Sequence, residues 1–251
     1  MKQLLTIAFV LGISATCSVA SGRDVTDYVD PRIGSEGLGR VFIGPTCPYG
    51  MVKPSPDCTS SPNSGWLPMP EQLNGFSQVH VSGTGGGPKY GNILVMPFTG
   101  VLSMGEHIDY RASEEIKLAY YATQMERSGI MAEITTAERA SIYRFTYPAG
   151  ENKALLVDAG FFLGESPVPD AREAQQFVGS EVAVLSDNEI AGYSRIRGGW
   201  NNGRAYTVYF YAVTDRPFGQ AITWKGDSLT NAVSQYDSGK KTGAMVQFAD
   251  A

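Results

Sequence analysis

A glycine-rich segment at residues 80–92 holds the densest set of groups that could bind a ligand, and it reads His-Val-Ser-Gly-Thr-Gly-Gly-Gly-Pro-Lys-Tyr-Gly-Asn. Glycine permits positive φ and a close approach of the backbone, so N–H groups here could meet the hydroxyl groups of a ligand. The segment leads into an apolar strand and contains no Gly-Lys-Ser/Thr sequence, which argues against phosphate binding. A tight connection that needs glycine only for its conformation would have the same composition.

Two further loops, residues 30–34 and 42–57, combine aromatic, proline and glycine residues in rigid backbone that could form a sugar platform or ordinary packed coil. Trp66 follows a turn-rich stretch at residues 60–64, so its indole is expected near the surface. There an indole can stack on the C–H face of a pyranose ring. The alternative is a tryptophan that fills a space in the core.

The ionisable side chains do not suggest a self-contained catalytic site. Glu114 and Glu115 are consecutive, so on a strand they face apart, and this pattern predicts solvent exposure. The other carboxylates considered are scattered along the chain: Glu106, Asp109, Asp158 and Glu165. The two histidines, His80 and His107, lie at no metal-ligand spacing from another soft ligand, so no metal site is predicted.

The elements that must position these groups are strands. Residues 24–91 are rich in glycine, proline and serine, which predicts long ordered loops with short strands. Apolar or alternating runs then predict strands at 93–96, 130–136, 141–147, 155–157, 182–185, 190–196 and 206–213, with 130–147 forming a hairpin. Only residues 170–176 read as a short helix. The expected fold is mostly β, an antiparallel β-sandwich with long Gly/Pro-rich loops and little helix.

Composition agrees with a single globular domain. The chain has 251 residues, of which 43% are hydrophobic and 18% charged, and it includes 29 glycines and 14 prolines. Its formal net charge of -5 and the lack of a Lys/Arg cluster exclude a nucleic-acid-binding surface of the usual electrostatic kind. No apolar stretch predicts a transmembrane span.

The N-terminus has the features of a secretory signal peptide over residues 1–20. Lys2 supplies the positive region, an apolar run follows, and small residues precede a cleavage site after Ala20. Cys17 lies in a partial match to a bacterial lipobox, so a lipoprotein is the alternative. A secreted or periplasmic location in a bacterium is expected.

Cleavage at Ala20 would leave an even pair of cysteines, Cys47 and Cys58, in a compartment that permits disulfides. The pair could close a loop as a disulfide, or both could remain buried free thiols.

Several ordered motifs carry a family resemblance. They are Asp-Pro-Arg-Ile-Gly at 30–34, Gly-Pro-Thr-Cys-Pro-Tyr-Gly-Met-Val-Lys-Pro-Ser-Pro-Asp at 44–57, Gly-Phe-Ser-Gln-Val-His-Val-Ser-Gly-Thr-Gly at 75–85 and Gly-Asn-Ile-Leu-Val-Met-Pro at 91–97. In this order they resemble the opening of glycoside hydrolase family 92, and the similarity continues at 143–148 and 208–218. The chain departs from many relatives at 37–40, where Gly-Leu-Gly-Arg replaces a His-rich turn.

The resemblance implies a galactose-mutarotase-like super-sandwich over residues 21–251, followed in the parent enzyme by an (α/α)₆ catalytic domain that this chain lacks. Such enzymes are calcium-dependent, inverting exo-α-mannosidases, and inversion needs two carboxyl groups about 6.5–9.5 Å apart. Both carboxyl groups and most calcium ligands are expected from the missing C-terminal domain. By position, the resemblance assigns to the sugar pocket Trp66, His80, Ser82, Gly83, Thr84 and Gly85.

The expected function is therefore the pocket-forming first domain of an exo-α-mannosidase, of α-1,2 type, acting on α-mannosides such as N-glycan mannose. The final run, residues 243–248, reads as a strand that stops without a partner, and this suggests a fragment. Two alternatives remain open. One is a stand-alone carbohydrate-binding module without catalysis, and the other is a structural domain that packs on a separately encoded catalytic chain.

Overall fold

The computed structural model describes residues 24–37, 39, 41–58, 65–81, 90–165, 174–199 and 203–249. The predicted signal peptide with Cys17 and Ala20 lies outside the described residues, as do Ser82, Gly83, Thr84 and Gly85. The elements are the 3-10 helix η1 (Val25–Tyr28) and the strands β1 (Ser55–Asp57), β2 (Gln72–Leu73), β3 (Gly75–Ser77), β4 (Leu94–Thr99), β5 (Asp109–Lys117), β6 (Tyr120–Met125), β7 (Met131–Thr136), β8 (Ser141–Thr146), β9 (Lys153–Asp158), β10 (Gln175–Val184), β11 (Glu189–Gly198), β12 (Ala205–Val213), β13 (Phe218–Lys225), β14 (Ser228–Thr230), β15 (Ser234–Asp237) and β16 (Thr242–Phe248).

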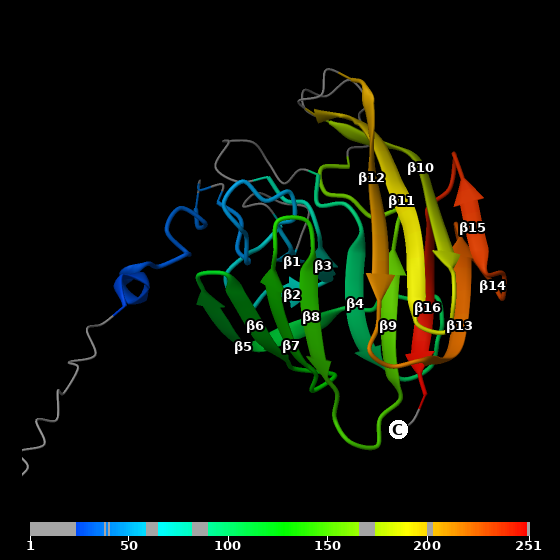
Figure 1. Cartoon of the computed structure of the whole chain (residues 1–251), viewed down its shortest axis with the longest axis horizontal. Helices are drawn as coiled ribbons and strands as arrows, with labels where there is room; N and C mark the ends of the chain where they lie inside the picture. The colour runs from blue at the N-terminus through cyan, green and yellow to red at the C-terminus, as the bar shows by residue number, and fades with distance from the viewer. Residues whose placement is uncertain are drawn as a thin grey trace, which may run out of the picture.

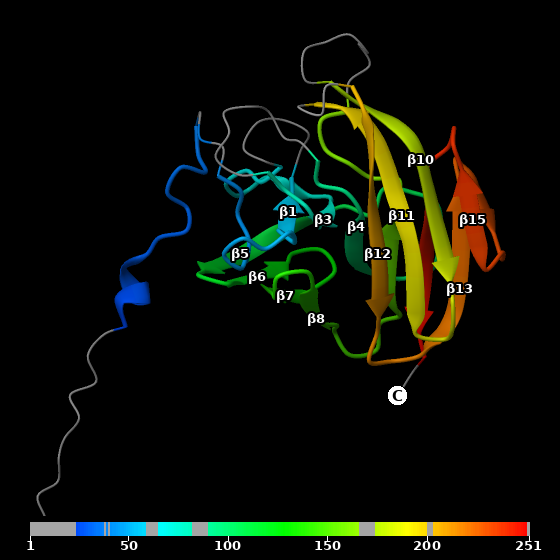
Figure 2. The same cartoon turned by 45° about the horizontal axis from the view of Figure 1, so that its top comes forward.

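The described strands form three sheets, and neighbouring strands within each sheet run antiparallel (Figure 1). The largest has the order β1-β3-β4-β9-β16-β13-β14, and the two smaller ones are β12-β11-β10-β15 and β2-β5-β6-β7-β8. Figure 2 shows β5–β8 to the left of β10–β12. The predicted mostly β, sandwich-like fold is confirmed.

Two apolar clusters fill the sandwich. One joins Phe76 of the seven-stranded sheet to Tyr121 and Ile134 of the five-stranded sheet. The other joins Val157 and Val246 of the large sheet to side chains of the four-stranded sheet, Val182 and Ile190. A single large sheet therefore packs against both smaller ones, and the alternation of side chains along each strand supplies the buried face.

The hairpin predicted for residues 130–147 is confirmed, since β7 pairs with β8 from Met131↔Thr146 to Thr136↔Ser141. The prediction of a helix at 170–176 is wrong for the part that the structure describes. Gln175 begins β10 and pairs with Gly198. No helix among the described residues is long and apolar enough to cross a membrane.

The expectation that residues 243–248 lack a strand partner is also wrong. β16 lies inside the large sheet and pairs with β9 on one side and β13 on the other. Its Ala244 and Val246 belong to the cluster shared with the four-stranded sheet, and Met245 belongs to a third apolar cluster with Ile222 and Trp224. The run is apolar because both of its faces are buried.

Candidate functional site

His80, one of the predicted pocket residues, is 3% exposed and both of its ring nitrogens are engaged. Nε2 lies 2.8 Å from Oδ1 of Asp57, and Nδ1 lies 2.9 Å from the carbonyl oxygen of Lys53. A carbonyl only accepts, so Nδ1 carries a proton. Nε2 faces a carboxyl oxygen, so the imidazole bridges the Lys53 carbonyl group and the Asp57 carboxyl group.

This arrangement differs from a nucleophilic triad. Ser77 Oγ lies 3.3 Å from Nε2, the same nitrogen that faces Asp57. A triad needs the hydroxyl and the carboxylate on opposite ring nitrogens. Asp57 Oδ2 also accepts a hydrogen bond from the Ser77 backbone N–H, at 3.0 Å, and Phe42 stacks on the imidazole with ring centroids 6.3 Å apart. The group therefore ties β1, β3 and residue 80 together.

The backbone that follows the glycine-rich residues adopts left-handed conformations. Tyr90 has φ 70°, Gly91 44° and Ile93 63°. A β-branched residue at positive φ is a genuine outlier, and each such residue costs about 1–3 kcal/mol unless the surroundings enforce it. At Gly91 an added Cβ would lie 2.7 Å from the Leu163 side chain, so only glycine fits. Strain of this kind clusters at functional sites.

Described residues from three separate parts of the chain converge on Tyr90. Tyr90 forms β-bridges with His80 and Leu163, and its N–H donates to Gln175 Oε1 at 3.3 Å. Gln175 Nε2 donates a hydrogen bond to the Leu163 carbonyl at 2.9 Å, and the Gly199 N–H donates one to the Ala174 carbonyl. We call His80, Tyr90, Leu163, Gln175 and Gly199 the loop-anchor cluster. It lies at the upper end of the sandwich in Figure 1, where β10 begins and β11 ends.

A buried polar bridge fixes the cluster to the four-stranded sheet. Tyr206 donates to Asn92 Oδ1 at 3.1 Å, and Asn92 Nδ2 donates to Ser194 Oγ at 3.0 Å. The Tyr206 ring packs on Tyr90, with centroids 5.4 Å apart. Burial raises the pKa of Tyr206 far above its ordinary value, so the phenol stays neutral and donates. Tyr90 and Asn92 could have been selected from the glycine-rich motif, whereas Gln175 and Tyr206 carry no comparable sequence signal.

The expectation that the Trp66 indole lies near the surface is wrong, because Trp66 is 2% exposed. Its Nε1 donates to Glu114 Oε1 at 3.0 Å, and the same oxygen accepts from Tyr121 and Arg111, both at 2.6 Å. Glu114 is therefore not solvent-exposed as predicted: its side chain is 7% exposed beside the fully buried Arg111. The buried guanidinium and the two aromatic donors explain why this carboxylate lies inside the protein.

The cysteines are both free thiols in the structure, so the loop-closing disulfide is not formed. Cys47 Sγ lies 3.5 Å from the Thr136 carbonyl and Cys58 Sγ lies 4.0 Å from the Leu67 carbonyl. Burial raises the pKa of Cys58 to about 11, which keeps it a thiol at neutral pH.

Three of the other carboxylates considered from sequence, Asp109, Glu115 and Glu165, make structural contacts. Asp109 accepts the backbone N–H groups of Arg127 and Ser128, at 2.8 and 3.0 Å. Glu115 pairs with Lys117, and Glu165 pairs with Lys241. Within the described residues, no three His, Cys, Asp or Glu side chains are grouped closely enough to hold a metal ion.

Comparison with known proteins gives the family. The model of the glycosyl hydrolase family 92 N-terminal domain matches residues 28–251. A protein of Arthroderma benhamiae described as an uncharacterized secreted glycosidase is 33% identical over 173 residues, covering 62% of this chain and 22% of its own length.

Solved structures agree in fold. A family GH92 α-mannosidase from Bacteroides thetaiotaomicron, in complex with mannoimidazole, superposes with a TM-score of 0.77 and 26% identity over 90% of this chain and 31% of its own. An inverting GH92 mannosidase from the same organism has a TM-score of 0.68 at 20% identity, covers 92% of this chain and 30% of its own, and supports the fold alone. The chain thus spans less than a third of these relatives. With the family model matched from residue 28 onwards, the chain belongs to glycosyl hydrolase family 92 and carries its N-terminal domain.

Proposed function

We propose that residues 21–251 form the sugar-pocket side of a secreted, calcium-dependent, inverting exo-α-mannosidase of α-1,2 type, released by signal cleavage after Ala20. The loop-anchor cluster carries this proposal. Three parts of the chain meet there beside strained backbone, and functional residues are concentrated on loops that a rigid scaffold positions. The mannoimidazole complex of the Bacteroides relative supports a mannoside as ligand.

Within this proposal, Ser82, Gly83, Thr84 and Gly85 bind sugar hydroxyl groups through backbone N–H and side-chain oxygens. His80 holds the start of this segment through its bonds to Asp57 and Lys53. Trp66, with its indole N–H bound by Glu114, contributes by fixing the backbone at residue 66 rather than by stacking on a sugar ring.

The chain by itself is proposed not to hydrolyse mannosides. The described carboxylates considered from sequence are largely committed to Arg111, Lys117, Lys241 and backbone donors. The acid, the base and the calcium ligands would then come from the remaining two thirds of a full-length relative.

Isothermal titration calorimetry with α-1,2-mannobiose tests sugar binding, and mannose release with and without calcium tests catalysis. We expect binding without turnover, and robust turnover by this chain would overturn the proposal. His80→Gln should weaken binding at least fivefold while leaving the far-ultraviolet circular dichroism spectrum intact. His107→Gln, the matched control at the only other histidine, should not change affinity.

A stand-alone carbohydrate-binding module is the second candidate, favoured by exposed tyrosines on the four-stranded sheet. Tyr209, Tyr211 and Tyr236 are 76%, 60% and 58% exposed. Aromatic faces of this kind can stack on sugars. This candidate predicts that Tyr236→Ala abolishes mannobiose binding and that His80→Gln leaves it unchanged, the reverse of the leading proposal.

A further inference from the structure

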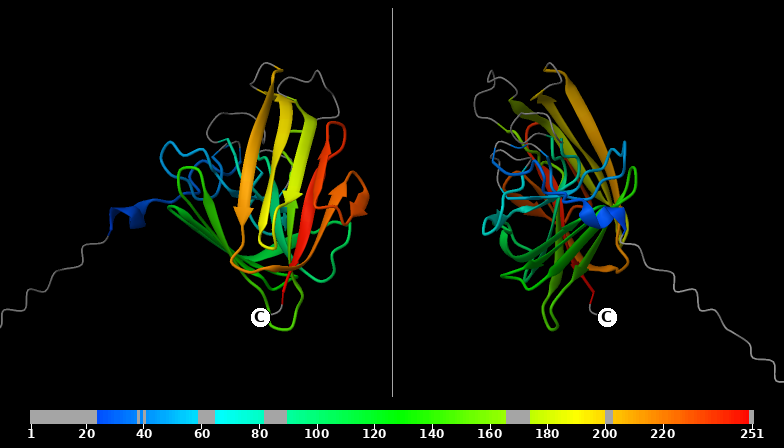
Figure 3. Two further views of the ribbon diagram at one scale, coloured as in Figure 1. Left: turned by 45° about the vertical axis from the view of Figure 1, so that its right-hand side comes forward. Right: turned by 90° about the vertical axis from the view of Figure 1, so that its left-hand side faces the viewer.

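The two smaller sheets leave a slot between them. Among the described strands, β8 ends the five-stranded sheet and β12 ends the four-stranded sheet, so each is paired on one side only. Figure 3 shows β5–β8 in green and β10–β12 in yellow and orange as two separate groups of strands. A cavity of about 1030 Å³ lies between them.

The pattern of lining residues shows which parts of the strands face this cavity. Two runs of consecutive residues line the cavity. One is 139–147, from β8 and its flanks, and the other is 208–216, from β12 and the residues after it. Because side chains alternate along a strand, a consecutive run means that the backbone edge faces the cavity. From the large sheet, by contrast, alternate residues contribute: Val95 of β4, and Leu155 and Val157 of β9. The slot therefore has two backbone edges as walls, and its floor is formed by the half-buried Phe145, Val208 and Phe210, which pack on the apolar face of the large sheet.

The β12 wall lacks the usual protection of an edge strand. Its nine residues, Ala205–Val213, include no charge, proline or glycine. Tyr209, Tyr211 and Val213 are 76%, 60% and 58% exposed along it. Proteins normally protect edges with Lys, proline, bulges or very short strands, and an apolar edge without them pairs readily with another strand.

The opposite wall limits what can enter. If a second copy of this chain paired through its own β12, the rest of its four-stranded sheet would have to enter the slot as well. That sheet would collide with β8 on the opposite wall. A single extended segment can pair with either edge while alternate side chains rest on the half-buried Phe145, Val208 and Phe210. The geometry therefore favours one strand over a sheet edge.

Charge indicates the composition of that strand. The lining carries four cationic side chains, Arg139, Arg144, Lys153 and Arg216, and a single carboxylate, Asp215. Arg144 is paired with Glu133, and no ion pair is recorded between Arg139, Lys153 or Arg216 and another described residue. A segment with acidic residues beside its apolar positions would complement this excess.

We propose that the slot between β8 and β12 binds one extended segment of a separate polypeptide, with apolar residues at alternate positions and acidic residues at its ends. Binding adds a strand to the β12 edge, with β8 as the second wall. This surface is distinct from the loop-anchor cluster and does not depend on the mannoside proposal.

The probe is a capped peptide, Glu-Val-Thr-Val-Thr-Val-Glu, added to the full chain. Hydrogen exchange should slow in residues 205–213 and 141–146 on binding, while the edge strand β14 (Ser228–Thr230) should not change. Replacing both Glu residues by Lys, or the central Val by Pro, should weaken binding at least tenfold.

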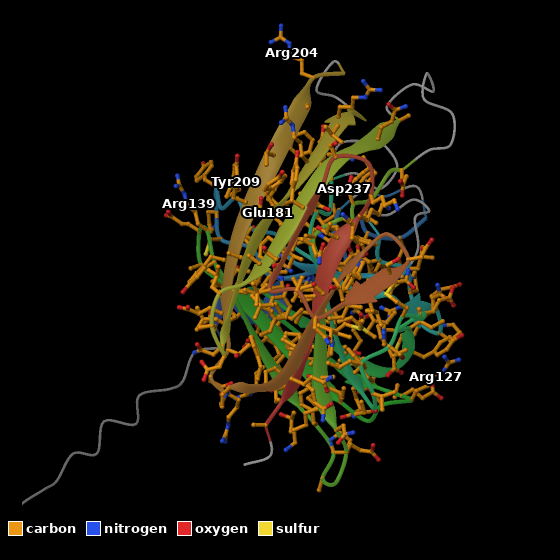
Figure 4. The ribbon with its side chains drawn as sticks, turned by 90° about the vertical axis from the view of Figure 1, so that its right-hand side faces the viewer. Arg127, Arg139, Glu181, Arg204, Tyr209 and Asp237 are labelled. Atoms are coloured by element: carbon orange, nitrogen blue, oxygen red, sulfur yellow. The ribbon has the colours of Figure 1, made fainter. Side chains whose placement is uncertain are left out.

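Matched variants separate the slot from the rest of the surface. Tyr209→Glu should weaken binding at least tenfold, whereas Tyr236→Glu should leave affinity within twofold. Both tyrosines are exposed and both contact Tyr193, at ring distances of 5.7 and 6.3 Å, but Tyr236 does not line the slot. Arg139→Glu should reverse the preference for acidic ends, and Arg127→Glu, on the other side of the view in Figure 4 from Arg139 and Tyr209, should not.

Peptide binding with protection of β12, lost in Tyr209→Glu, would support the proposal. No binding, equal binding of the Pro-containing peptide, or binding without β12 protection would overturn it. Protection of β12 before any peptide is added would also overturn it, because the occupant would then be another part of the same chain or, if sedimentation shows a dimer, a second copy.

Discussion

Replacing Asp158 by Asn should change how the stability of this protein depends on pH. Asp158 ends β9, opposite Leu94 and Gly243, and its Oδ1 accepts the Gly160 N–H at 2.8 Å. Burial raises the pKa of its carboxyl group from 3.8 to about 6, although Lys241 acts in the opposite direction. The turn that Asp158 begins leads to Leu163, so the carboxyl group supports the loop-anchor cluster.

The direction and size of this pH dependence follow from the pKa values of Asp158 in the unfolded and folded states. Between pH 3.8 and about 6 the folded state holds a proton on Asp158 that the unfolded state has lost. The stability contributed by this proton is fully present below pH 3.8 and is lost as the pH rises to about 6. One pKa unit corresponds to about 1.4 kcal/mol, so ionised Asp158 costs the folded protein roughly 3 kcal/mol at pH 7.

As the pH rises from 3.5 to 7, the free energy of unfolding of Asp158→Asn should therefore increase by roughly 3 kcal/mol relative to that of the wild type. The altered hydrogen bond adds a difference that does not depend on pH. Urea denaturation followed by tryptophan fluorescence at several pH values measures this difference. Asp237→Asn is the control. The Gly239 N–H lowers the pKa of exposed Asp237, so the stability of this variant relative to wild type should fall as the pH rises. A stability difference for Asp158→Asn that does not change with pH would refute the reasoning.

Two further substitutions test the buried contacts around the site. Glu114→Ala should destabilise the fold by about 3–5 kcal/mol in urea denaturation, because it leaves the charge of Arg111 buried without its partner. Glu115→Ala, on the exposed face, should cost less than about 1 kcal/mol, and equal effects of the two changes would contradict the structure. Gly91→Ala should cost roughly 2 kcal/mol or more in the same assay, because φ is 44° and Leu163 lies 2.7 Å from the added carbon. Gly105→Ala meets nothing within 4 Å and should be close to neutral, so a comparable loss there would count against the steric explanation.

Local sequence predicted several of the strands, and its motifs predicted the family. Alternating residues at 130–136 and 141–147 predict a hairpin because side-chain period and turn length are properties of neighbouring residues. The glycine-rich motif predicted positive φ at its glycines, whereas the positive φ of the neighbouring Tyr90 and Ile93 was seen only in the structure.

Tertiary structure decided what neighbouring residues could not. Trp66 and Glu114 are 48 residues apart, and their hydrogen bond explains why an indole after a turn-rich stretch and a carboxylate on a strand are both buried. Gln175, predicted in a helix, pairs with Gly198 and supports Tyr90, because strand pairing is satisfied by distant partners. Likewise, the unprotected edge of β12 is visible only when the order of strands in the sheets is known. Sequence specifies each strand's faces, but only folding determines which edges and charges meet.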